Sequence, residues 1–126
     1  MGSIISAPSV LVDNQTIKIV PNTVVYNPGY GDQTYRMASA GGLSLSPVVT
    51  TNPETMKSKL HFSVYPDSDI IPLFDSWAVG QHVVSWTDAT SGLTRTLQNA
   101  VLITSPDVAL GTDTTIGLEF EGMPSL

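Results

Sequence analysis

The sequence predicts a mainly β protein: an antiparallel β-barrel or sandwich with one short flanking α-helix and an extended arm or loop. Apolar residues mostly alternate with polar ones, which is the period of a half-buried strand. Turn-forming residues recur at intervals of roughly ten residues, and only one segment has helical spacing. With 126 residues the chain has room for one domain. We therefore assign 1–126 to a single β domain, with 1–12 as an N-terminal extension.

Three segments show the strand alternation most clearly. Residues 116–121 place Ile, Leu and Phe on one face, and Gly and two Glu on the other. Residues 59–65 alternate in the same way, and Ile17 and Ile19 flank Lys18. Each segment is expected to form a strand with one buried face.

A hairpin is expected farther along the chain. Residues 83–87 and 94–104 are β-branched and apolar, and the connection 88–92 ends in a glycine that can take the positive φ of a turn. Residues 43–51 form another extended run, but Pro47 cannot donate to a ladder. This run should lie at an edge or carry a bulge, and it is a candidate arm for exchange between subunits.

The single predicted helix covers residues 70–78, where apolar side chains fall at spacings of three and four. Asp67, Ser68 and Asp69 precede it and offer side-chain oxygens for the N-cap. Gly80 is the residue type that favours the C-terminal end of a helix. We expect this helix to cover one side of the sheet.

The amino-acid composition excludes or disfavours several classes of function. Charged residues make up 13% of the chain, about half the usual share, and the formal charge is −6. This acidity disfavours a nucleic-acid-binding groove, which needs clustered Lys and Arg. The chain has no cysteine, which excludes a thiolate metal site and a cysteine nucleophile. No apolar run reaches the roughly 18 residues of a membrane helix, so we expect no membrane partner.

Catalytic chemistry has few candidate residues. His61 and His82 lie in predicted strands and are interpreted as solvated strand residues. Residues 42–46 begin like a nucleophile elbow but end in serine, with no helix following. Three aspartates near the predicted helix lack the glycine and closing glutamate of an EF-hand. We therefore expect no enzyme, no cofactor and no metal site.

Two neighbouring segments favour self-assembly instead. Residues 26–42 are rich in Gly and Tyr and predict an exposed functional loop. Residues 41–52 contain no charged side chain, although free strand edges are normally guarded by charge. An unguarded edge of this kind is expected to pair with another copy of the chain.

The order of these parts resembles the tail tube proteins of contractile-tailed bacteriophages. The resemblance spans about residues 13–122, and it is carried by these motifs: Val20-Pro21-Asn22, Pro28-Gly29-Tyr30-Gly31-Asp32-Gln33, Ala38-Ser39-Ala40-Gly41-Gly42, the run 54–64, Leu73-Phe74-Asp75-Ser76-Trp77 and the run 116–122. It implies a structural virion protein whose hexameric rings stack into the tube that conducts the genome during ejection. It also implies a surrounding sheath and baseplate or terminator proteins as partners, with assembly in the host cytoplasm.

Site residues follow from the resemblance for two surfaces. Contacts between subunits are expected at Tyr30, Asp32, Gln33, Tyr35, Arg36, Leu43, Leu45, Val48 and Val49. The candidates for an acidic lumen, past which DNA slides without sticking, are Glu119, Glu121, Asp88 and Asp113. Pairing of Glu119 and Glu121 with Lys57 and Lys59 across strands is the alternative for the first two.

Other functions remain open at this point. A head-to-tail connector or a capsid decoration protein would share the composition and the oligomeric state. A carbohydrate-binding sandwich would use Trp77, Trp86 and the loop tyrosines as stacking platforms, although both tryptophans are better explained as core residues.

Overall fold

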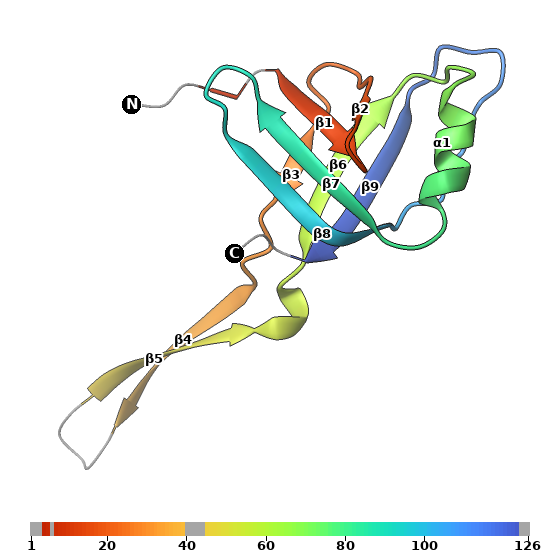
Figure 1. Ribbon diagram of the computed structural model, residues 1–126. Helices are drawn as coiled ribbons and strands as arrows, with labels where there is room; N and C mark the ends of the chain where they lie inside the picture. Colours follow the sequence, from red (N-terminus) through yellow and green to blue (C-terminus); the bar gives the residue numbers. More distant parts are fainter. Residues whose placement is uncertain (1–3, 6, 40–44, 124–126) are drawn as a thin grey trace.

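The chain folds into a β-sheet body from which a two-stranded arm projects (Figure 1). The computed structural model describes residues 4–5, 7–39 and 45–123. The elements, in chain order, are β1 (Pro8–Val12), β2 (Gln15–Ile17), β3 (Val25–Asn27), β4 (Asp32–Ser39), β5 (Leu45–Asn52), the 3-10 turn η1 (Pro53–Thr55), β6 (Ser58–Val64), α1 (Ile70–Trp77), β7 (His82–Asp88), β8 (Thr94–Leu102) and β9 (Ile116–Met123).

Seven strands form the body sheet in the order β2-β1-β7-β8-β9-β6-β3, and every pair is antiparallel. The predicted mainly β, antiparallel fold with one helix is confirmed. The sheet is not closed into a barrel, because β2 and β3 remain at its two edges. A single bridge between Ile19 and Val64 joins the segment after β2 to β6, and the body is sandwich-like.

Strands β6 and β9 confirm the alternation predicted from the sequence. Their register places Leu60 opposite Phe120 and Phe62 opposite Leu118, and all four side chains are fully buried. The residues between them point to the other face and are partly exposed. The predicted hairpin is also present as β7 and β8, although β8 ends at Leu102.

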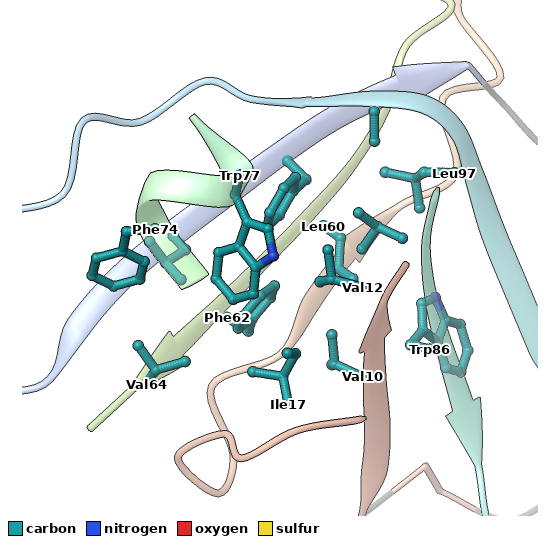
Figure 2. Close-up of a cluster of buried hydrophobic side chains, with 14 of the residues drawn as sticks. Val10, Val12, Ile17, Leu60, Phe62, Val64, Phe74, Trp77, Trp86 and Leu97 are labelled. Carbon is teal, nitrogen blue, oxygen red and sulfur yellow. The ribbon is translucent and has the colours of Figure 1, made fainter. Parts of the chain in front are cut away.

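Helix α1 closes the core by packing an aromatic side chain against this pair of strands. Trp77 is 5.7 Å from Phe120 in an edge-to-face contact, and Phe120 stacks on Phe62 at 6.0 Å. Figure 2 shows Trp77 and Phe74 among the buried side chains between the helix and the strands. The helix lies where the sequence predicts it, because its buried residues follow the helical spacing.

The predicted N-terminal cap of α1 is wrong. Asp69 occupies the cap position, but its side chain makes no capping hydrogen bond. Its φ of −77° and ψ of −16° are helical, whereas a capping side chain usually belongs to an extended residue. The turn is closed instead by the Ile70 N–H, which donates to the Asp67 carbonyl at 3.1 Å.

The first twelve residues, expected as an extension, contain a strand of the body sheet. Strand β1 pairs with β2 on one side and β7 on the other, and Val10 and Val12 are buried in the core. Asp13 and Asn14 have φ of 51° and 66°, so they form the two-residue turn that suits the twist of a hairpin. Their short polar side chains tolerate this backbone conformation better than most.

The arm consists of β4 and β5, which pair with each other over eight residues each and form a sheet of their own. In Figure 1 the arm leaves the lower end of the body and points away from it. The expectation of a loop over 26–42 is wrong for Asp32–Ser39, because pairing with β5 extends these residues despite their low aliphatic content. Both arm strands are edges, which is the position that Pro47 requires.

Glycine fixes the root of the arm against the body. Gly29 has a φ of +75°, and a Cβ there would lie 2.5 Å from the backbone of Lys57 and Ser58. Ser58 is fully buried and its hydroxyl donates to the Pro28 carbonyl at 2.7 Å. The Gly29 N–H in turn donates to Asn27 Oδ1 at 2.9 Å. The arm is therefore attached by a tightly packed root.

Gly29→Ala should destabilise the protein by about 3 kcal/mol or more, since it adds a backbone clash to the strain of a positive φ. Gly92→Ala is the matched control: Gly92 has a φ of +77° with nothing within 4 Å of its Cβ position. The control should lose only the strain, about 1–2 kcal/mol. Urea unfolding of both variants measures the difference, and equal losses would show that the root is not tightly packed.

Candidate functional site

The register of the arm separates its side chains into two faces. Tyr35 lies opposite Val49 and Met37 lies opposite Pro47, so these four residues share one face, which we call the apolar arm face. All four are exposed, with 68% of Tyr35, 49% of Met37 and 58% of Val49 accessible. No charged residue interrupts this face.

The opposite face of the arm is polar. Thr34 lies opposite Thr50, and Arg36 lies opposite Val48. Thr34, Thr50 and Arg36 are exposed, whereas Val48 is partly buried. The arm is therefore an amphipathic two-stranded ribbon. Water can solvate its polar face, so only the apolar arm face gains from being covered by another surface.

Exposing an apolar face of such a ribbon to water costs free energy. A two-stranded hairpin is marginally stable by itself in water, and it cannot bury one of its own faces. Full burial of a large apolar side chain contributes about 1.5–3 kcal/mol. Covering Tyr35, Met37 and Val49 would therefore stabilise both the arm and the contact that covers it.

The predicted contact residues are spread over the arm and its root. Tyr30 is 61% exposed at the root, and the backbone N–H of Asp32 donates to Thr55 Oγ1 at 2.6 Å. Gln33 is exposed at the beginning of β4. Leu45 begins β5 opposite Ser39, and Leu43 lies outside the described residues.

The body contains an apolar pocket that the sequence interpretation did not identify. Its volume is about 630 Å³, and it is lined by Ile5, Ala7, Pro8, Ile19, Pro21, Asn22, Val24, Tyr26 and Trp86, none of them charged. Tyr26 meets Trp86 edge-to-face at 5.3 Å, and burial raises the pKa of the Tyr26 hydroxyl. The lining residues come from three separate segments, 5–8, 19–26 and Trp86, so no local pattern in the sequence reveals the pocket.

Two of the lumen candidates lie on the outer face of the sheet. Glu121 Oε1 is 3.8 Å from Lys57 Nζ, and it also lies opposite Lys59 in the register. Glu119 lies opposite His61. Both glutamates are partly exposed, and cross-strand pairing, the alternative expected from the sequence, is confirmed for Glu121 and Lys57.

The other two lumen candidates, Asp113 and Asp88, differ in their exposure to solvent. Asp113 is exposed in the connection between β8 and β9. Asp88 is only 3% exposed, so in the subunit it is not a surface acid. Ser91 Oγ donates to Asp88 Oδ2 at 2.6 Å, and the Thr90 N–H donates to Oδ1 at 3.3 Å. These bonds, the Ser91 hydroxyl first, lower the pKa of the Asp88 carboxyl and fix the β7–β8 turn.

His82 is not the solvated strand residue expected from the sequence. Its Nδ1 is 2.7 Å from Asp13 Oδ2, and its Nε2 is 3.2 Å from the Trp77 carbonyl and 3.0 Å from the Val79 carbonyl. The ring thereby joins the β1–β2 turn to the end of α1. This arrangement has a structural use, because all three described partners of the ring are a turn carboxylate and backbone carbonyls.

Among the described residues, no three His, Cys, Asp or Glu side chains are placed to hold a metal ion. No helix in those residues is long and apolar enough to cross a membrane.

Comparison with known proteins adds no assignment: no protein-family model matches the chain, and no curated protein matches it.

The hydrogen bonds at Asp88 should make stability depend on acid pH. The pKa of the Asp88 carboxyl is lower in the folded state than the ordinary value for an aspartate, so the carboxylate stabilises the fold above that ordinary value and loses this effect as the pH falls through the folded-state pKa. The difference in unfolding free energy between the wild type and Asp88→Asn should therefore shrink as the pH is lowered from 5 towards 2. Asp107→Asn, which removes one exposed carboxylate, controls for net charge. Equal pH dependence in the two variants would contradict the role of Asp88.

Proposed function

We propose that this protein is a structural subunit of a phage tail tube, assembling into hexameric rings that stack into a conduit for the genome. The observation that carries the proposal is the apolar arm face, which projects from the body uncovered. An exposed apolar surface rimmed by polar residues typically marks a site of protein association. The resemblance expects subunit contacts at residues 27–36 and 41–51, and the described parts of these two segments contribute to both strands of the arm.

The body sheet offers a second route to association. Strands β2 and β3 lie at its edges, so one side of each strand has no neighbour in the described sheet and is available to pair with another chain, although each is only three residues long. Pairing between subunits at these edges would join the separate sheets into one wall. This arrangement suits a closed ring of identical copies.

Charge supports the passage of DNA through such a ring. Six copies at −6 each carry a formal charge of −36, which repels phosphate. The outer face of β9 supplies Glu119 and Glu121, and the β8–β9 connection supplies Asp113. A sheath, and baseplate or terminator proteins, would be further partners in the virion.

A head-to-tail connector or capsid decoration protein would use the same arm, and the shape of the assembly distinguishes them. The carbohydrate-binding alternative keeps only the exposed loop tyrosines, Tyr30 and Tyr35, as stacking platforms. Trp77 and Trp86 are only 3% and 5% exposed, so neither indole is free to stack on a sugar ring.

The wild-type protein should form rings or tubes at high concentration, visible by electron microscopy and sedimentation. Val49→Asp places a carboxylate on the apolar arm face and should block assembly while the subunit stays folded. Thr50→Asp adds the same charge to the polar face and is the matched control. A folded wild type that stays at 13.4 kDa under these conditions would overturn the proposal. Compact particles without a channel would indicate a decoration protein.

Reversing charge on β9 tests the lumen. Tubes carrying Glu119→Lys and Glu121→Lys should bind duplex DNA at low salt, with an affinity that falls as salt is raised, because each lysine can neutralise a phosphate. Asp67→Lys with Asp69→Lys, two exposed changes just before α1 that alter the net charge by the same amount, is the control. If the double variant binds DNA no better than the control, these glutamates do not line the channel.

A further inference from the structure

We propose that the apolar pocket of the body is the receptor for the apolar arm face of a second copy of this chain. The inference rests on the proposed function, and it adds where the arm binds. The two surfaces in this contact are the apolar arm face, with its four residues, and the pocket lined by Pro8, Pro21, Tyr26 and Trp86 among others.

The apolar arm face and the pocket are both free of charged side chains. The other recess of the body, between α1 and residues 102–108, includes the carboxylate of Asp75. The outer face of the sheet carries Lys59, His61, Glu119 and Glu121. Covering a charge with apolar side chains costs free energy unless the charge finds a partner. The uncharged pocket is therefore the better match for the arm.

Trp86, which lines the pocket, carries a hydrogen-bond donor without an acceptor. Its indole Nε1 is buried and has no partner within the described residues. Buried donors normally find an acceptor, so this tryptophan is a place where a contact with another chain would change the surroundings of the donor.

The arm points away from the pocket of its own chain. In Figure 1 the arm leaves the lower end of the body and points outward, whereas the start of β1, the β2–β3 connection and the end of β7 lie at the upper end, and β3, which carries Tyr26, runs between the two ends. Close packing of Gly29 against Lys57 and Ser58 holds the root in place. The occupant must therefore come from another copy.

The area of the contact indicates how strongly a single arm would bind. A strand of eight residues is about 26 Å long, and two strands are about 10 Å wide, so the arm face covers on the order of 300 Å². A stable pair of proteins usually buries about 800 Å² on each side. One arm contact alone would be weak, and repetition would give it strength.

An arm that binds a different surface on the next copy makes a head-to-tail contact. Every copy then donates one arm and offers one pocket. Contacts of this kind generate closed rings or continuing helical assemblies rather than isolated dimers. The geometry thus agrees with rings and tubes.

The test uses two variants: one has a defective arm face and an intact pocket, and the other has an intact arm face and a defective pocket. Tyr35→Asp disables the arm face, and Ala7→Glu places a carboxylate at the exposed mouth of the pocket. Thr34→Asp on the polar arm face and Leu110→Glu on the β8–β9 connection are the matched controls. Near-ultraviolet circular dichroism checks that each variant is folded.

Each disabled variant should fail to assemble, and both controls should assemble like the wild type. An equal mixture of the two disabled variants should show only weak association at high concentration and reach at most about twice 13.4 kDa, because one intact arm meets one intact pocket and nothing repeats the contact. If the Ala7→Glu variant assembles like the wild type, the arm binds elsewhere, and the inference fails while the proposed function stands. If the wild type itself stays monomeric, the proposed function fails with it.

Cross-linking supplies an independent measurement, since the chain contains no cysteine. Ala7→Cys in one population and Val49→Cys in another should give a disulfide-linked dimer under mild oxidation when the two are mixed. Val49→Cys paired with Leu110→Cys is the control and should give little product. Equal yields from both mixtures would overturn the placement of the arm in the pocket.

Discussion

The close approach of Gly29 to the backbone of Lys57 and Ser58 holds the arm and the body in one arrangement. Strand β6 begins at this contact, and the same strand then pairs with β3 and β9 and carries the centre of the core. The arm is therefore attached to the most buried part of the sheet. A preformed projection of this kind loses less conformational entropy on binding than a flexible loop would.

The protein divides its apolar surface between two uses. The body buries its share internally, where Trp77, Phe120 and Phe62 pack between α1 and the sheet (Figure 2). The arm has no second layer, so its apolar face remains exposed. Low overall charge fits this division, because a surface that is covered on assembly needs fewer charged side chains.

Buried polar groups have structural uses that resemble functional sites in the sequence. His82 joins the β1–β2 turn to the end of α1, and Asp88 organises the β7–β8 turn. Both residue types are common in catalytic sites, but here each is surrounded by local hydrogen bonds. The same groups therefore help to determine a single packing of the helix and hairpins against the sheet.

The amino-acid sequence by itself determined the strand alternation of β6 and β9, the β7–β8 hairpin and helix α1. These are local patterns, because the period of the apolar residues directly selects the secondary structure. It also located the uncharged segment that becomes half of the arm. Tertiary structure alone decided that 32–39 pairs with 45–52, that β1 enters the sheet and that Asp88 is buried. The apolar pocket belongs to the same group, since its residues meet only when distant segments pack together. Such contacts depend on which strands become neighbours, and that choice is set by the burial of the whole core rather than by any short stretch of sequence.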